Sequence, residues 1–146
     1  MSGRILGVDQ GDKRIGLAVS DPSATIASPL QVLMHVSRVI DAAQIVNIGA
    51  EYGVARFIVG LSSDDEGVPT PQGRKAVRLA DAIRQQTNIP VEMWDESFST
   101  TTAREARIAM GVKRDKRKGH LDDLAATVIL QSYLDTLRQS EGGISE

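Results

Sequence analysis

Apolar runs separated by short polar breaks define the first expected elements of this chain. Residues 5–8 are apolar and stop at Asp9, a polar turn covers residues 10–13, and a second apolar run covers residues 15–19. Two apolar runs joined by a tight turn that contains Gly11 are typical of a β-hairpin. The sequence therefore predicts an antiparallel hairpin at the start of the chain.

The rest of the chain alternates between strand-like and helix-like patterns. We expect a third strand from Ile26 to Met34, at an edge of the sheet because Pro29 cannot donate a backbone hydrogen bond. Ser37 and Gly53 are suitable caps for the two ends of the first helix. The apolar face of that helix would contain Val39, Ile40, Ala43, Ile45, Val46, Ile48 and Ala50. The further expected elements are a strand over 55–60, a polar loop over 61–72, a helix over 73–87, a strand over 90–96, a helix from 99 or 100 to 110, and a helix over 121–137.

This order of elements predicts a single α/β domain. Strand–helix–strand units imply parallel pairing with right-handed crossovers, whereas the opening hairpin is antiparallel. We therefore expect a mixed five-stranded sheet with helices on both faces, as in the ribonuclease H-like class. The expected domain covers residues 1–139, and residues 140–146 would form a flexible C-terminal tail.

Composition excludes several kinds of site and location. The chain of 146 residues has no Cys and only two His, so disulfides, zinc–thiolate sites and His-rich metal sites are not expected. No apolar run approaches the ~20 residues that a membrane-spanning helix needs, and no secretory signal pattern opens the sequence. These absences predict a cytoplasmic protein without a membrane partner.

Charge is distributed unevenly although the net charge is only -2. Residues 113–118 hold five cations in six positions, namely Lys113, Arg114, Lys116, Arg117 and Lys118. Taken alone, such a run is better interpreted as a solvated loop. It leads directly into the last predicted helix, however, which makes it a candidate binding surface for phosphates.

Acidic residues at the ends of predicted elements are the main candidates for chemistry. Asp9 ends the first strand, Asp95 and Glu96 end the last strand, and Asp122 and Asp123 open the final helix. Carboxyl ends of parallel strands gather at one edge of a sheet, so these acids are expected to meet there. Clustered carboxylates repel one another unless a cation neutralises them, and Mg²⁺ prefers such oxygen ligands. Strand-end turns and helix caps are the alternative roles, which we favour for Asp95 and Asp123.

Motifs spread over nearly the whole chain resemble the YqgF/RuvX family of ribonuclease H-fold nucleases. The similar segments are residues 7–21 (GVDQGDKRIGLAVSD), Ile58 to Leu61, Pro71-Gln72, Asp95-Glu96 before Phe98-Ser99-Thr100, and residues 122–131 (DDLAATVILQ). The chain departs from the family pattern at Asp12, where the family usually has Thr, at Ser97, where it has Arg, and in the acidic loop over 62–67. These departures concern substrate affinity and leave the acids in place.

The resemblance implies catalytic, metal-binding acids at Asp9, Glu96 and Asp122, with Mg²⁺ or Mn²⁺ as the cofactor. It implies a nuclease linked to trimming the 5′ end of pre-16S ribosomal RNA, a step of ribosome biogenesis. We expect the substrate to be bound by Lys13, Arg14, Lys113, Arg114, Lys116, Arg117 and Lys118.

Three alternatives remain open from the sequence. The family was earlier associated with resolution of Holliday junctions, so branched DNA is the second candidate substrate. Actin-like ATPases share a similar strand–Asp–Gly–strand pattern, but they need two such domains to enclose a nucleotide. A non-catalytic RNA-binding module of ribosome assembly is the third alternative. With few aromatic residues and no obvious dimerisation stripe, we favour a monomer acting on RNA.

Overall fold

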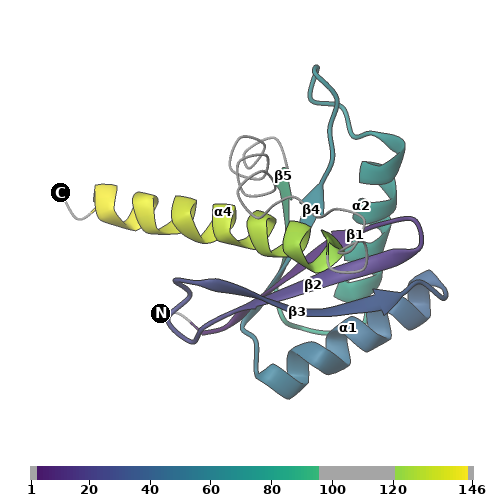
Figure 1. The fold of residues 1–146 in the computed structure, drawn as a ribbon, viewed down its shortest axis with the longest axis horizontal. Helices are drawn as coiled ribbons and strands as arrows, with labels where there is room; N and C mark the ends of the chain where they lie inside the picture. The colour runs from purple at the N-terminus through teal and green to yellow at the C-terminus, as the bar shows by residue number, and fades with distance from the viewer. Residues whose placement is uncertain (1–2, 96–120, 145–146) are drawn as a thin grey trace.

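The computed structural model describes residues 3–95 and the helix over 121–144, with side chains of that helix from 124 to 139. A five-stranded sheet has the order β3-β2-β1-β4-β5, with α1 and α2 on one face and α4 across the other (Figure 1). This arrangement confirms the predicted mixed sheet with helices on both faces. None of the described helices is long and apolar enough to cross a membrane.

The hairpin and β4 form the centre of the sheet, and β5 lies at one of its edges. Strands β1 (Ile5–Gln10) and β2 (Arg14–Ser20) pair antiparallel, as predicted, and the Gly11 N–H donates to the Arg14 carbonyl at 2.9 Å to close the turn. Strands β4 (Arg56–Leu61) and β5 (Val91–Asp95) run parallel to β1. A side chain at Gly11 would lie 2.5 Å from the Arg14 carbonyl oxygen, so the turn requires glycine there.

Strand β3 (Ala27–Met34) lies at the edge of the sheet, as Pro29 predicts. It pairs antiparallel with β2, and the register shifts between Leu17 and Ala18, close to the position where Ala18 faces Pro29. The irregularity coincides with the one residue of β3 that has no N–H to donate.

Helix α1 (Arg38–Tyr52) begins and ends at the predicted caps. The Ser37 side chain accepts a hydrogen bond from the Ile40 N–H, and Gly53 adopts φ 63°, the left-handed conformation that glycine tolerates best. The predicted broad apolar face is wrong at both ends of the helix, however. Val39, Ile40 and Ala50 are exposed. Asp41 is buried instead, because its carboxylate is used in the β3–α1 connection.

Helix α2 (Pro71–Arg84) begins earlier and ends earlier than the predicted range of 73–87. Thr70 caps its N-terminus by accepting from the Gly73 N–H at 3.0 Å. Proline suits the first position of a helix because its missing N–H would have had no partner there. The preceding loop is consequently shorter than predicted, and a bridge between Ser63 and Pro69 closes it.

Each face of the sheet carries its own apolar core. Leu6 and Val8 of β1 belong to the core beneath α1 and α2, together with Phe57 and Val59 of β4. The opposite core lies beneath α4 (Leu121–Ile144) and includes Ile5 and Ile58 of the sheet with Leu130 and Leu134 of the helix. Alternation of side chains along each strand divides the residues between the two cores.

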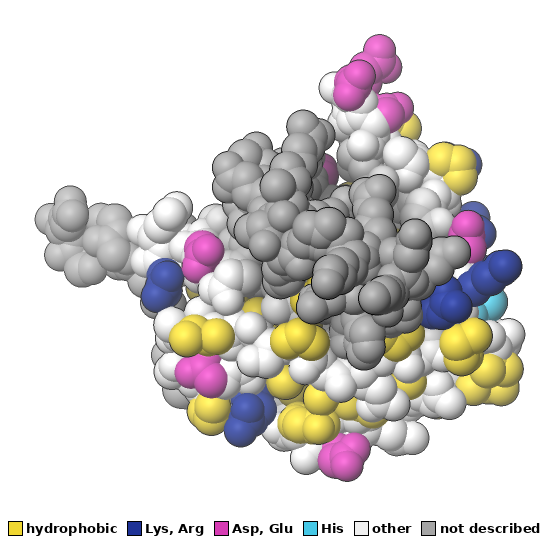
Figure 2. Space-filling model, viewed as in Figure 1, with side chains coloured by type: hydrophobic (Ala, Val, Ile, Leu, Met, Phe, Trp, Pro, Cys, Tyr) yellow, Lys and Arg dark blue, Asp and Glu magenta, His cyan; other side chains and the backbone are white. Residues whose placement is uncertain are grey.

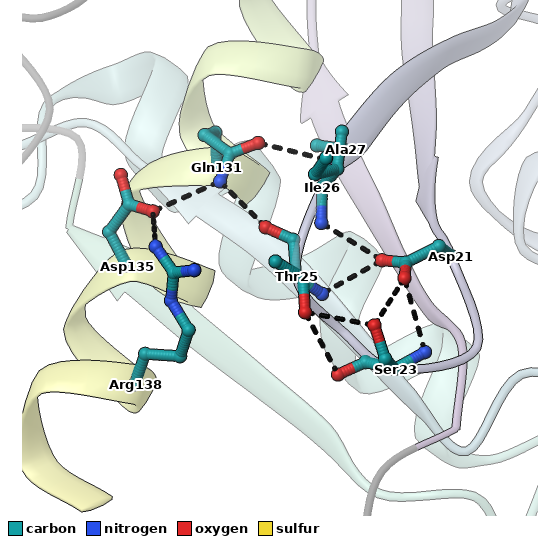
Figure 3. Close-up of polar contacts among 8 residues, drawn as sticks. All are labelled: Asp21, Ser23, Thr25, Ile26, Ala27, Gln131, Asp135 and Arg138. Carbon is teal, nitrogen blue, oxygen red and sulfur yellow. Dashed lines mark hydrogen bonds and ion pairs between the residues drawn. The ribbon is translucent and has the colours of Figure 1, made fainter. Parts of the chain in front are cut away.

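Two features hold α4 against the sheet. Gly7 allows close approach, since a Cβ there would lie 2.9 Å from the Leu130 Cβ. Farther along the helix, the Gln131 side chain accepts from the Ala27 N–H at 2.9 Å and donates to the Thr25 carbonyl oxygen at 3.0 Å (Figure 3). Gln131 thereby satisfies one backbone N–H and one backbone carbonyl where the β2–β3 loop meets β3.

The β2–β3 loop is in turn shaped by Asp21. Its carboxylate accepts from the backbone N–H groups of Ile26 at 2.9 Å and Thr25 at 2.8 Å, and from the Ser23 hydroxyl (Figure 3). Several hydrogen bonds hold the pKa of Asp21 well below its usual range, and the one from the Ile26 N–H has the largest effect.

Some predicted segments lie outside the described residues. They are the helix from 99 or 100 to 110, the basic run over 113–118, and the ends of the chain at 1–2 and 145–146. Helix α4 itself continues to Ile144, beyond the predicted end at Leu137. The division into a domain over 1–139 and a tail over 140–146 stays a prediction.

Replacing Gln131 with Leu should lower the free energy of unfolding by about 1–3 kcal/mol, because the Ala27 N–H and the Thr25 carbonyl lose their partners. Urea unfolding of both proteins measures the difference. Gln86→Ala is the matched control, since Gln86 makes one exposed hydrogen bond to the Val39 carbonyl. Equal losses in the two variants would contradict the anchoring role of Gln131.

The lowered pKa of Asp21 predicts how stability depends on acid. The folded protein binds this proton less readily than the unfolded chain, so Asp21 stabilises the fold above the unfolded pKa of about 3.9 and loses that effect as pH falls toward the folded pKa. Wild type should therefore exceed Asp21→Asn in unfolding free energy at neutral pH, and the gap should narrow steadily below about pH 4. A difference in unfolding free energy between the two proteins that stayed constant over this pH range would contradict the stabilising role of the Asp21 carboxylate.

Candidate active site

The ends of several elements lie together at the end of the sheet where its parallel strands finish, which we call the site edge. Strands β1, β4 and β5 are parallel and end at Gln10, Leu61 and Asp95, so their carboxyl ends share this edge. Helices α1 and α2 begin there, and the first turn of α4 lies beside the same end of β1 (Figure 1). Clefts at the carboxyl ends of parallel strands are common sites of chemistry in α/β proteins.

Asp9 lies at this edge on the face that α4 covers. Val8 points into the α1–α2 core, whereas position 7 faces Leu130 and the Ala126 carbonyl of α4. Because side chains alternate along a strand, Asp9 shares the face of Gly7. Asp9 is partly buried and is paired with Gly16 across the hairpin, so rigid backbone holds its carboxylate in place.

Asp95 lies at the same edge but on the opposite face. Trp94 contacts α4, with its ring centroid 5.3 Å from that of Tyr133, so the next residue points away from α4. The Ser63 hydroxyl donates to the Asp95 Oδ2 at 3.3 Å in agreement with this orientation. The sheet therefore separates the carboxylates of Asp9 and Asp95.

The other predicted acids are only partly visible. Glu96 lies outside the described residues, and Asp122 and Asp123 are described only as backbone in the first turn of α4. Within the described residues, no three His, Asp or Glu side chains are grouped closely enough to hold a metal ion. The convergence of Asp9, Glu96 and Asp122 stays a prediction.

The β1–β2 turn brings charged side chains to the edge beside Asp9. Asp12, one of the departures from the family pattern, forms an ion pair with Lys75 of α2 at 3.0 Å. Lys13 and Arg14 are exposed, and neither is in an ion pair with the rest of the described chain. The acid that this turn adds is thus neutralised locally, while two predicted substrate-binding cations stay available. The cations over 113–118 lie outside the described residues.

Gln72 is a residue of the site edge whose role the sequence did not reveal. Its Nε2 donates to the Gln10 carbonyl, next to Asp9, and so ties the start of α2 to the end of β1. The two residues are far apart in the sequence, and the only signal was that Pro71-Gln72 belongs to the family-like motifs. We infer that Gln72 positions the backbone that carries Asp9.

The sequence matches a known family over most of its length. The family model for RuvX, described as a Holliday junction resolvase, matches residues 3–136. The chain belongs to the RuvX family. A relative from Caldanaerobacter subterraneus is 42% identical over 138 residues, which cover 94% of this chain and 99% of the relative. A relative from Desulforamulus reducens is 38% identical over 91% of this chain and 97% of its own length. Both carry the name "Putative pre-16S rRNA nuclease".

Solved structures share the fold of this RuvX-family chain. Thermus thermophilus RuvC in complex with a Holliday junction matches with a TM-score of 0.64 and 17% identity, over 94% of this chain and 96% of RuvC. The fowlpox virus resolvase in complex with junction DNA matches with a TM-score of 0.55 and 16% identity, over 92% and 98% of the two chains. These similarities confirm the ribonuclease H-like fold, and the family and its relatives identify the chain as a nuclease.

The two faces of the site edge predict different outcomes for two similar substitutions. Asp9→Asn should abolish nucleic-acid cleavage, because an amide is a poor substitute for a carboxylate at a catalytic or metal-binding position. Asp95→Asn should retain most of the activity, because its side chain points to the opposite face and contacts Ser63. Cleavage rates of an end-labelled nucleic acid test this, with thermal unfolding as the check that both variants fold. Loss of activity in both would show that Asp95 belongs to the site.

Proposed function

We propose that this nuclease hydrolyses phosphodiester bonds with Mg²⁺ or Mn²⁺ held by Asp9, Glu96 and Asp122, and that it processes the 5′ end of pre-16S rRNA. The observation that supports the proposal most directly is the position of Asp9. Its carboxylate lies at the edge where three parallel strands end, on the face where α4 begins. Glu96 directly follows β5, and Asp122 is the second residue of α4.

The chemistry of the donor set suits a divalent metal. Carboxylate oxygens are hard ligands that Mg²⁺ and Mn²⁺ accept, whereas no Cys is present in the chain to select a softer metal. When bound, such ions activate water and neutralise charge that develops on the scissile phosphate. The protein holds its first ligand rigidly, because Asp9 pairs with Gly16 of β2 and the preceding Val8 pairs with strands on both sides, with Leu17 of β2 and Val59 of β4.

Names and charge favour RNA as the substrate. The curated relatives carry a name that refers to pre-16S rRNA. Lys13 and Arg14 lie at the site edge, and the basic run over 113–118 directly precedes the helix with Asp122. A monomer with one site and cations at its edge suits a single flexible strand, which it would bind through the phosphate backbone. Ribosome biogenesis, in the cytoplasm, is the process in which we expect it to act.

Holliday junction resolution is the second candidate function, because the description of the matching family model names it. Resolution requires two symmetric cuts across a four-way junction, and hence two sites that act together in a dimer. The RuvC and fowlpox resolvase similarities concern the fold and do not choose between the substrates.

The decisive experiment compares cleavage of an end-labelled pre-16S 5′ extension with cleavage of a synthetic four-way junction, with Mg²⁺, with Mn²⁺ and with a chelator. We expect faster cleavage of the RNA and none after chelation. Glu96→Gln and Asp122→Asn should abolish this activity, because each removes a metal ligand. Asp123→Asn is the matched control and should be nearly silent, since it lies roughly 100° away from Asp122 around the helix.

Each part of the proposal has its own contrary outcome. Paired symmetric nicks in the junction at rates above those on RNA would favour resolution. Undiminished cleavage in the chelator would exclude the metal, and equal loss in Asp122→Asn and Asp123→Asn would refute the assignment of the third ligand.

A further inference from the structure

The connection from β3 to α1 exposes an unusual number of large apolar side chains. The described residues contain seven exposed large hydrophobic residues, and four of them lie within residues 34–40. These four are Met34, Val36, Val39 and Ile40, which are 61%, 58%, 67% and 44% exposed. Exposed apolar residues that are contiguous commonly mark a contact surface, whereas single scattered ones need no explanation. We call residues 34–40 the β3–α1 surface.

Cations without carboxylate partners adjoin these apolar side chains. Arg38 lies within the β3–α1 surface, and Arg14 faces Met34 in the strand register. The His35 N–H donates to the Lys13 carbonyl at 2.9 Å, which ties the surface to the β1–β2 turn. Among the described residues, none of these three cations is in an ion pair. Figure 2 shows Lys and Arg side chains gathered beside a histidine and a group of apolar side chains.

The two neighbouring acids, Asp12 and Asp41, already have partners within the described chain. Asp12 is paired with Lys75 at 3.0 Å. Asp41 is only 1% exposed, and its carboxylate accepts from the Val36 N–H at 3.0 Å and contacts the His35 Nδ1 at 2.5 Å. This contact occupies the Nδ1 of His35, so Nε2 is the ring nitrogen that can contact another molecule. A buried carboxylate thus holds an exposed imidazole in a fixed orientation.

The β3–α1 surface lies close to the candidate active site. Asp9 pairs with Gly16, which pairs with Val32, so Asp9 and Val32 are level across two strand spacings. His35 is three residues farther along, which places it roughly 14 Å from Asp9 at about 3.3 Å per residue and about 4.8 Å per strand. A nucleic-acid strand spans that separation in about four nucleotides at ~3.4 Å each, and in fewer when it is extended.

We propose that the β3–α1 surface binds the single-stranded part of the substrate next to the cleaved bond. Phosphates would contact Lys13, Arg14 and Arg38, while unstacked bases would lie against the His35 ring, the Arg38 guanidinium and the apolar side chains. The proposal rests on the proposed function, since the bound strand is its substrate. A protein partner could also cover apolar groups, but continuity with the site edge favours nucleic acid, as do cations that pair with no acid of the described residues.

Binding without cleavage tests the proposal directly. Fluorescence anisotropy in a chelating buffer should compare a long dye-labelled single-stranded RNA with one of about four nucleotides. His35→Ala and Val39→Ser should each weaken binding of the long RNA about five-fold or more, the effect of losing one base contact. Arg38→Ala should also flatten the dependence of affinity on salt by a slope of about 0.7. Binding of the short RNA should change less, because it need not reach beyond the site edge.

Two matched controls lie elsewhere on the described surface. Arg78→Ala removes an exposed cation of α2, and Ile26→Ser removes an exposed apolar side chain that lies outside residues 34–40. Both should leave the affinity nearly unchanged. Thermal unfolding of every variant verifies that the fold is intact.

Cleavage kinetics separate this proposal from the proposed function. Because the surface would bind the strand beside the cleaved bond and holds none of the proposed metal ligands, the His35 and Arg38 variants should raise KM for the RNA extension and leave kcat unchanged. Metal-dependent cleavage with normal RNA affinity in these variants would overturn the β3–α1 proposal alone and leave the surface to a protein partner. If wild type bound RNA without cleaving it, and these variants bound RNA more weakly than wild type, the result would support the β3–α1 surface and refute the nuclease mechanism.

Discussion

The close contact between α4 and β1 is the constraint on which the rest of the structure depends. Gly7 lets the helix approach the strand, and Gln131 fixes the far part of the helix to the β2–β3 loop. Since α4 carries Asp122 in its first turn and β1 carries Asp9, the same contact determines how far apart two of the proposed ligands lie. Gly7 and Gln131 therefore help to set the spacing of the proposed ligands, although neither takes part in the reaction.

The pleat of the sheet divides the acids of the site edge into two groups. Asp9 belongs to the α4 face, and Asp95 belongs to the α2 face, where Ser63 donates to it. Two carboxylates at one edge would repel each other if they shared a face, and the sheet backbone prevents this. In the β1–β2 turn, an ion pair with Lys75 neutralises Asp12. Lys13 and Arg14 are therefore left to other partners.

Local signals allowed much of the fold to be predicted. The hairpin, the caps at Ser37 and Gly53 and the edge position of the Pro29 strand follow from the conformational preferences of single residues. The inner face of α1 was misjudged because Asp41 is buried by a contact with His35, which no helical periodicity reveals.

The site was predictable in part for the same reason. The position of Asp9 at the end of a strand follows from the apolar run before it. The bond from Gln72 to the Gln10 carbonyl and the pair between Lys75 and Asp12 join residues far apart in sequence, so only the folded chain shows them. The family resemblance, rather than spacing, selected Glu96 and Asp122 among the neighbouring acids.

Strand β3 has a consequence for self-association. An exposed edge strand offers unpaired backbone groups to which another strand can add, and long regular edges promote aggregation. Pro29 interrupts the ladder of N–H donors in β3, and the register shift between Leu17 and Ala18 distorts the adjoining pair. Two copies of the chain therefore lack an unbroken β3 edge along which to join their sheets, which disfavours strand-mediated aggregation at this edge.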